Sequence, residues 1–155
     1  MLKKSISLNL VTLALFTADR ILKFWFSNNP AFSRDFIDNF LSFRFEVNSG
    51  IAFGVRIDRI LLLFLVISII FVLFGLLFRA YRESRPLDVF SVTLIVVGAI
   101  SNLIDRLRFG FVVDYINVPF FTVFNLADVM ITVGVFFLAV GLFSNKKNSG
   151  QNYDI

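Results

Sequence analysis

The longest uncharged run of the chain, residues 60–78, limits its fold more than any other feature. These 19 residues include no Asp, Glu, Lys or Arg. As an α-helix they would be about 28 Å long, which nearly matches a bilayer hydrocarbon core of roughly 30 Å. The chain is also 57% hydrophobic and holds 22 Phe among its 155 residues, more apolar side chains than one soluble core of this size needs. We therefore predict an integral membrane protein.

Three further apolar runs predict three more spans, at residues 5–26, 87–105 and 128–143. The first run follows two lysines and resembles a secretory signal, but no small-x-small cleavage site follows it, so we interpret it as a retained span. In the next, Gly98 and Ser101 are small enough to let a neighbouring helix approach closely. The expected fold is all-α: a single membrane domain over residues 1–155 with four transmembrane helices, ending in a disordered polar tail at 144–155.

The connection between the first two spans, residues 27–59, has a different pattern. Residues 28–30 (Asn-Asn-Pro) predict the end of the first helix. Residues 41–48 alternate strictly between apolar and polar side chains, which is typical of a half-buried strand, and a second apolar piece follows a turn at 51–54. We predict a small β-sheet on the membrane surface between helices 1 and 2. Its aromatic side chains belong either to an ordinary hairpin or to an apolar floor that receives a lipid-bearing ligand, made of Phe43, Phe45 and Phe53.

The distribution of basic residues predicts how the chain is oriented. Seven of them fall on one side of the predicted bundle, with few acidic neighbours: Lys3, Lys4, Arg79, Arg82, Arg85, Lys146 and Lys147. On the other side basic and acidic residues are interleaved. Short loops rich in Lys and Arg face the cytoplasm, so we expect both termini to be cytoplasmic and the sheet to be extracytoplasmic. The net charge of +4 then reflects membrane orientation, and no nucleic-acid partner is expected.

Two aspartates beside the last two spans have unusually apolar sequence surroundings. Asp114 and Asp128 have no basic residue within five positions. A carboxyl group among apolar neighbours holds its proton longer than it would in water, and two such groups brought together can share one proton. That sharing is the electrostatic requirement of an aspartic protease. The chain contains neither Cys nor His, which excludes thiol and Ser-His catalysis and the usual zinc ligands, so no metal or other cofactor is expected.

Several amide and basic side chains map to the same depth as these aspartates. Asn102 and Arg106 are four residues apart and share one helical face. Asn125 lies three residues before Asp128 and is either a helix cap or part of a site. Six polar residues converge in this way on one side of the membrane: Asn48, Asn102, Arg106, Asp114, Asn125 and Asp128.

Two more aspartates are predicted to form ion pairs. Asp105 lies three residues before Arg108, and pairing between them is its expected role. Asp19 and Lys23 lie four apart on one helical face and are able to pair. Either this is an interfacial ion pair, or Asp19 points into a polar cleft.

Four of these segments together resemble the lipoprotein signal peptidases, the signal peptidase II family. They follow the family's order and spacing over about eighty residues: 48–54 (NSGIAFG), 102–106 (NLIDR), 112–115 (VVDY) and 124–128 (FNLAD). The resemblance implies that Asp114 and Asp128 are a catalytic dyad. It also implies that Asn48, Asn102, Arg106 and Asn125 position the substrate or the dyad, and that Asp19 matches an acidic residue late in the family's first helix. Arg20 departs from the Gln that commonly follows that residue.

The same resemblance implies a membrane aspartic endopeptidase of the bacterial cytoplasmic (inner) membrane, with its active site toward the outer face. Its substrate would be a prolipoprotein bearing a diacylglyceryl cysteine, cut before that cysteine, and we expect a monomer in contact with membrane lipid. Two alternatives belong to other classes. A small transporter or proton-relay subunit would use intramembrane carboxylates too, but should place them near mid-bilayer, often within internal repeats. A four-span scaffold would leave the paired aspartates unexplained.

Overall fold

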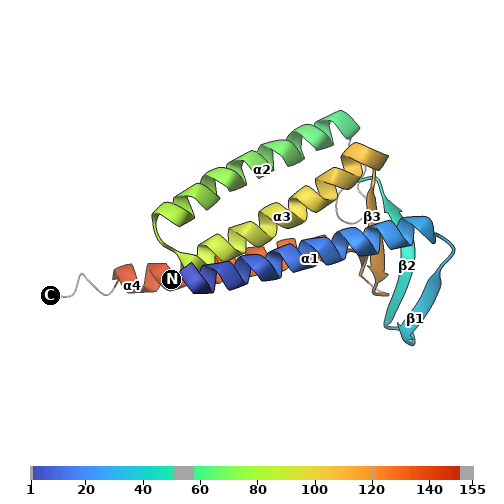
Figure 1. The fold of residues 1–155 in the computed structure, drawn as a ribbon, viewed down its shortest axis with the longest axis horizontal. Coiled ribbons are helices and arrows are strands. Elements are labelled where there is room, and N and C mark those ends of the chain that lie inside the picture. Colours follow the sequence, from blue (N-terminus) through green and yellow to red (C-terminus); the bar gives the residue numbers. More distant parts are fainter. Residues whose placement is uncertain (1, 51–57, 120, 151–155) are drawn as a thin grey trace.

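Four long helices and a small sheet make up the computed structural model, which describes residues 2–50, 58–119 and 121–150, with side chains from residue 9 to 141. The elements in chain order are α1 (Leu2–Asn28), β1 (Ser33–Ile37), β2 (Leu41–Asn48), α2 (Arg59–Arg82), α3 (Pro86–Phe109), β3 (Val112–Asn117), β4 (Val123–Phe124) and α4 (Leu126–Gly150). Figure 1 shows the helices running along the long axis of the molecule and the sheet at one end. The start of α1 and the end of α4 lie at the opposite end.

Local sequence signals explain where the middle helices begin and end. Asp58 caps α2, because its Oδ1 accepts hydrogen bonds from the backbone N–H groups of Ile60 and Leu61 at 2.9 and 3.0 Å. Pro86 occupies the first turn of α3, where a missing N–H costs nothing, and Gly110 ends that helix with a left-handed φ of 85°. Among the described residues, α2 and α3 are long and apolar enough to cross a membrane.

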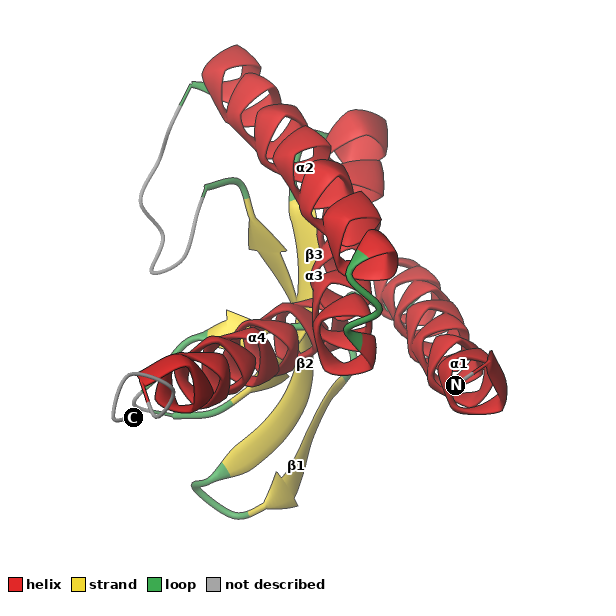
Figure 2. Cartoon of the chain, turned by 90° about the vertical axis from the view of Figure 1, so that its left-hand side faces the viewer, coloured by secondary structure: helices red, strands yellow, loops and turns green. Residues whose placement is uncertain are grey.

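Helix α3 is the centre of the bundle, with α1, α2 and α4 diverging around it in Figure 2. Its contact with α4 is so close that it requires glycine. A Cβ added to Gly98 would lie 2.6 Å from the carbonyl oxygen of Ala127, and one added to Gly134 would lie 2.6 Å from that of Ser91. The prediction that small residues allow close helix approach is confirmed here at Gly98. This contact brings the first turn of α4 against the C-terminal half of α3.

The sheet is larger than the sequence pattern indicates. Residues 41–48 form β2, as predicted, but the four-stranded antiparallel sheet has the order β1-β2-β3-β4 and takes half its strands from the connection between α3 and α4. The predicted sheet between helices 1 and 2 is therefore present in part, because β1 and β2 lie in that connection while β3 and β4 do not. Residues 112–117 do not alternate, because Val112 to Tyr115 are all buried, so strand periodicity does not reveal them. The predicted piece at 51–54 lies outside the described residues.

The prediction of a disordered tail from residue 144 is also wrong over the described part of the tail. Helix α4 continues to Gly150. Once an apolar run has nucleated a helix, each added residue contributes one hydrogen bond, so polar residues can prolong it without packing. Residues 151–155 lie outside the described part of the chain.

An aromatic cluster joins α1 to the sheet. Phe26, Val113 and Tyr115 are buried together, and the rings of Phe26 and Tyr115 stack with centroids 5.0 Å apart. Phe43 and Phe45 of β2 pack against this cluster. Packing of this kind holds β3 rigidly against α1, and β3 carries Asp114.

Candidate active site

Asp114 on β3 and Asp128 in the first turn of α4 are bound by the same residue, Asn125. The Nδ2 of Asn125 donates to Asp114 Oδ1 at 2.6 Å, and its backbone N–H donates to Asp128 Oδ2 at 3.2 Å. Asn125 Oδ1 in turn accepts from the backbone N–H of Asp128 at 2.9 Å. The last two bonds form a reciprocal capping box at the start of α4. Asn125 is therefore the helix cap, one of the two alternatives that its sequence position allows, and it also binds both aspartates.

Each of the two remaining carboxylate oxygens has an amide donor from another element. Asn102 of α3 donates from Nδ2 to Asp128 Oδ1 at 2.8 Å, and Asn48 at the end of β2 donates from Nδ2 to Asp114 Oδ2 at 3.0 Å. All four oxygens thus accept one hydrogen bond, and these bonds hold both carboxyl groups in fixed orientations. Five predicted site residues, Asn48, Asn102, Asp114, Asn125 and Asp128, are brought together from four different elements.

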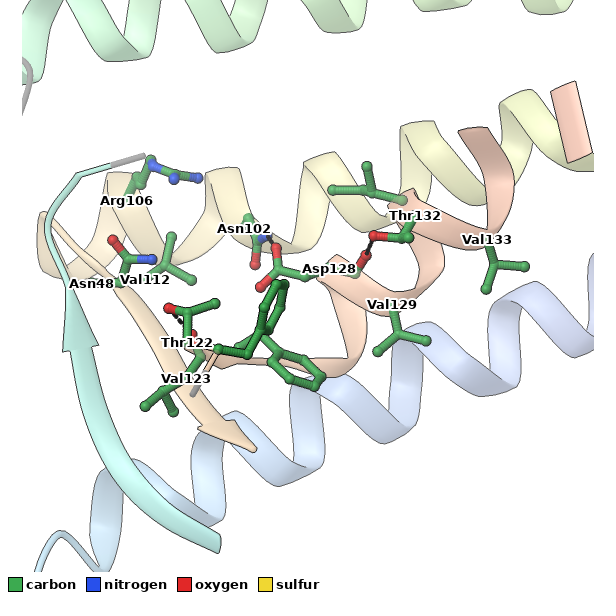
Figure 3. A pocket seen from close by; sticks show the side chains of 13 residues that line it. Asn48, Asn102, Arg106, Val112, Thr122, Val123, Asp128, Val129, Thr132 and Val133 are labelled. Carbon is green, nitrogen blue, oxygen red and sulfur yellow. Dashed lines mark hydrogen bonds between the residues drawn. The ribbon is translucent and has the colours of Figure 1, made fainter. Parts of the chain in front are cut away.

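A largely apolar cavity of about 490 Å³ opens beside Asp128. Figure 3 shows Asn48, Asn102, Arg106 and Asp128 on its wall, together with valines and threonines. The remaining lining residues are Phe121, Phe124 and Ile131. Arg106 donates from Nη2 to the carbonyl oxygen of Gly50 at 3.3 Å, while its buried Nε has no hydrogen-bond partner among the described residues. A buried donor without a partner is costly, so this N–H is a candidate contact for a bound molecule.

Asp114 lines a second hollow, of about 310 Å³, over the sheet. Asn48, Thr122 and Val123 line both this hollow and the larger cavity. The two aspartates therefore lie where an apolar cavity meets a polar one. Neither Phe43 nor Phe45 lines either space. Phe43 instead lines a separate apolar groove with Trp25 and Phe36, so the aromatic floor for a lipid-bearing ligand stays a prediction. Phe53 lies outside the described residues.

Behind the pair, Asp19 of α1 is completely buried and supports the segments that carry it. Its carboxylate accepts hydrogen bonds from Ser101 Oγ at 2.6 Å, Tyr115 Oη at 3.0 Å and the backbone N–H of Ala127 at 3.2 Å. It also pairs with Lys23 Nζ at 3.3 Å, which confirms that these two residues pair. Because both side chains are buried, the pair lies inside the bundle, and Asp19 points into the polar interior.

The predicted partner of Asp105 is wrong. This buried carboxylate pairs with Arg20 at 2.6 Å and Lys23 at 2.9 Å, both from α1, and also accepts from the backbone N–H of Val113 at 3.3 Å. Arg108 is exposed, and its guanidinium lies 4.9 Å from the ring centroid of Phe109. Asp105 lies on the face of α3 that packs against α1, whereas Arg108 points away from the bundle.

Lys23 and Arg20 are the site residues that the motifs did not identify. Lys23 is 1% exposed, and its Nζ donates to Asn102 Oδ1 at 2.6 Å. Arg20 also donates to the carbonyl oxygen of Ser101 at 3.1 Å. The sequence did contain one signal for them: Arg20 is adjacent to Asp19, and Lys23 lies four residues after it, on the same helical face. That signal does not say what they contact on another helix.

The electrostatics of the site favour the protonated form of Asp114. Burial first, and then the negative charge of Asp128, raise the pKa of Asp114 to about 7, although Asn48, Asn125 and Lys23 oppose the shift. Four carboxyl groups and three cations are gathered here, so the cluster is neutral when the pair holds one proton. They are Asp19, Asp105, Asp114 and Asp128 with Arg20, Lys23 and Arg106. Among the described residues, no three acidic side chains are arranged to hold a metal ion.

Comparison with known proteins places the chain among characterised sequences. The family profile described as Signal peptidase (SPase) II matches residues 11–144. A lipoprotein signal peptidase of Syntrophomonas wolfei is 37% identical over 137 residues, covering 86% of this chain and 91% of that relative. Another, from Streptococcus agalactiae, is 30% identical over 154 residues, covering 96% and 99%.

Two solved structures share the fold. Each is described as a bacterial membrane enzyme. One has a TM-score of 0.80 at 24% identity and covers 92% of this chain and 90% of its own. The other has a TM-score of 0.74 at 25% identity and covers 88% and 92%.

Proposed function

The chain belongs to the signal peptidase II family, and from that premise we propose that it is a membrane protease that removes signal peptides from prolipoproteins, using Asp114 and Asp128 as its catalytic pair. The observation that carries the proposal is the hydrogen bonding of the two carboxyl groups. Every oxygen of the pair has one donor, supplied by Asn48, Asn102 or Asn125, so the pair is held ready beside a cavity.

The reaction follows from the single proton of the pair. Asp114, whose pKa is about 7, carries the proton, and the Asp128 carboxylate acts as general base toward a water molecule. The water oxygen attacks the scissile carbonyl carbon, its proton passes to Asp128, and Asp114 donates its own proton to the carbonyl oxygen. When the C–N bond breaks, Asp128 gives its proton to the leaving nitrogen and Asp114 recovers one from the intermediate's hydroxyl. Each proton is therefore returned, and one water is consumed.

The substrate we propose is a prolipoprotein with a diacylglyceryl cysteine, cut before that cysteine. The cavity beside Asp128 is mainly apolar, which suits a signal helix and acyl chains that remain in lipid. Arg106 supplies the unpaired buried Nε–H, which suits a peptide carbonyl of the bound substrate. The polar hollow that contains Asp114 suits the hydrated chain beyond the cleavage site.

We further propose that α1 to α4 all span the bacterial inner membrane, as a monomer with both termini cytoplasmic. Three observations support this topology: the length and apolarity of α2 and α3, the outward apolar side chains of α2 such as Phe71 at 80% exposure, and the position of the sheet opposite the helix ends that carry the basic residues. The pair then lies at the outer lip, where the scissile bond can meet water. A mid-bilayer proton relay is not favoured.

Membrane lipid is the second partner we propose, in a groove of about 600 Å³ between the outer part of α1 and the β1–β2 hairpin. Trp25, Phe36 and Phe43 line it together with one cation, Arg34. This groove shares no lining residue with the two hollows at the aspartates. The diacylglyceryl group offers a guanidinium only neutral ester oxygens, whereas an anionic phospholipid of the bilayer also offers a negative charge, so the phospholipid is the occupant we propose.

Trp25 is the only tryptophan of the chain and reports on that groove. In bilayers of brominated phosphatidylcholine, unbrominated phosphatidylglycerol should relieve quenching of Trp25 at a lower mole fraction than unbrominated phosphatidylcholine does. Arg34→Gln should abolish this preference. Arg44→Gln, which removes the same charge beside the Asp114 hollow, should keep it. Equal relief by both lipids in the wild-type protein would refute the lipid site.

The catalytic proposal is tested with purified protein and a lipidated precursor. Asp114→Asn and Asp128→Asn should each lower the cleavage rate by about 10²–10⁴-fold, because each removes one partner of the proton exchange. Asp35→Asn, the same change at an exposed position on β1, should cleave at the wild-type rate. If either of the first two variants cleaves normally, the pair is not the catalytic group. If the protein were a transporter or a scaffold, the purified wild-type protein would not cleave the precursor at all.

A further inference from the structure

Lys23 has three acceptor atoms around its ammonium group inside the bundle. Its Nζ donates a hydrogen bond to Asn102 Oδ1 at 2.6 Å and forms ion pairs with Asp105 Oδ2 at 2.9 Å and Asp19 Oδ2 at 3.3 Å. An ammonium has donors and no acceptor, so Asn102 can meet it only with its amide oxygen. The side chain is 1% exposed, which means that water does not compete for these contacts.

The contact with Asn102 decides which way that amide faces. Because a lysine only donates, Asn102 must turn its oxygen toward Lys23, and its NH₂ group then points to the other side. That NH₂ group donates to Asp128 Oδ1 at 2.8 Å. Asn125 Nδ2 supports the same orientation more weakly, at 3.1 Å, while it also donates to Asp114. If the amide were reversed, an oxygen would face the Asp128 carboxylate, which is repulsive.

We infer that Lys23 is a positioning residue of the peptidase reaction: it orients the Asn102 amide toward Asp128 and supplies the positive charge that lets the acidic pair keep one ionised member in the bundle interior. The inference rests on the proposed function of the pair. Lys23 contacts neither carboxyl group of the pair. It acts on them through its hydrogen bond to Asn102 and through the electrostatic effect of its positive charge.

The charged groups around Lys23 come from four elements. Helix α1 contributes Asp19 and Arg20, α3 contributes Asp105 and the exposed Arg108, which lines a small hollow together with Lys23, and the pair itself lies on β3 and α4. Arg20 is directed to Asp105 and to the backbone of Ser101. Lys23 is therefore the cation of α1 that contacts the amide bound to Asp128, and it acts on Asp114 as well.

Lys23→Met tests the inference, because methionine fills a similar volume without charge or donors. We expect kcat to fall about 100-fold, the effect of misplacing a catalytic group by about 1 Å, with a much smaller change in KM. The bell-shaped pH profile of kcat should move toward higher pH by about one pH unit, because a lost cation makes both ionisations of the pair harder. Lys23→Arg keeps the charge and should restore the position of the profile. Arg82→Gln removes one positive charge at an exposed position at the far end of α2, and it should leave kcat and the pH profile unchanged.

A second variant covers the case in which Lys23→Met does not fold. Lys23→Met with Asp19→Asn removes one cation and one anion, so the cluster keeps its charge balance. Its kcat should remain far below that of Asp19→Asn alone, because Asn102 has lost the shorter of its two hydrogen bonds, the one from Lys23, in both the single and the double lysine variant. A double variant as fast as Asp19→Asn would overturn the inference, as would Lys23→Met with an unmoved pH profile. If Asp114→Asn also cleaves normally in the same assay, the catalytic pair itself is wrong; if it does not, only the role of Lys23 is.

Discussion

Replacing Asp114 by Asn should stabilise the protein at alkaline pH while it abolishes cleavage. The folded pKa of Asp114 is about 7, against 3.8 for an ordinary aspartate. A carboxyl group with a raised pKa binds its proton more tightly in the folded state, so folding loses free energy as pH rises from the unfolded pKa to the folded one. Between pH 5 and pH 8 this loss amounts to about 2.6 kcal/mol, from 1.36 kcal/mol per unit of pKa difference. Below about pH 4 Asp114 is protonated in both the folded and the unfolded state, so it no longer makes stability depend on pH.

Asparagine has almost the same shape and does not titrate, so Asp114→Asn escapes this loss. The variant still loses about 1 kcal/mol where its new NH₂ group meets the donors of Asn48 or Asn125, but that cost is the same at every pH. The measured quantity is therefore the difference in unfolding free energy between variant and wild type, followed from pH 5 to pH 8. Equilibrium unfolding in mixed detergent micelles, monitored by circular dichroism, supplies it.

Between pH 5 and pH 8, the unfolding free energy of Asp114→Asn should rise by about 2–3 kcal/mol relative to that of the wild type. Most of this change should occur below about pH 7.5. Asp35→Asn is the control, since an exposed carboxyl group should give a curve parallel to that of the wild type. A curve for Asp114→Asn that is also parallel would refute the burial and charge coupling on which the proposed proton sharing depends.

Three further predictions concern rate and packing. Cleavage by the wild-type protein should fall about tenfold per pH unit above pH 7, as Asp114 loses its proton, and a stopped assay across pH 5–9 checks this. Gly98→Ala should cost about 1–3 kcal/mol of unfolding free energy, because its Cβ would meet the Ala127 carbonyl oxygen at 2.6 Å. Gly75→Ala, with nothing within 4 Å of the added methyl, should instead be neutral or stabilising in the same unfolding experiment. Asn125→Ala should lose about 1 kcal/mol of helix capping and about 10²-fold or more of kcat, so a variant that is stable yet fully active would contradict its double role.

The helices could be predicted from the chain because their signal is local. The uncharged run 60–78 lies within α2 and the run 87–105 lies within α3, and the alternation at 41–48 coincides with β2. Apolar side chains must leave water wherever the helix is placed, so neither prediction needs knowledge of the neighbours. Asp114, Asp128 and their three asparagines were identified by motif for a related reason, since the chemistry of a site restricts which residue types it can use.

Strand β3 and the partners of Asp105 could not be predicted in this way. Val112 to Tyr115 are buried on both faces, so their strand conformation depends on β2 lying alongside them and on Phe26 stacking over Tyr115. Asp105 and Arg108 are three apart on α3, and helical spacing favours them as partners, yet Asp105 faces α1 and finds Arg20 and Lys23 there.

Spacing along one helix or strand says which side chains are neighbours on that element. Which face then meets another element is settled by packing, through contacts such as Gly98 against Ala127, and those contacts join residues from distant parts of the chain. The polar support of the aspartate pair, from Lys23 on α1 through Asn102 on α3 to Asp128 on α4, consists entirely of such contacts. The residue types of this site can therefore be predicted from the sequence. Their hydrogen bonds and charge balance arise only when three helices and a sheet are packed together.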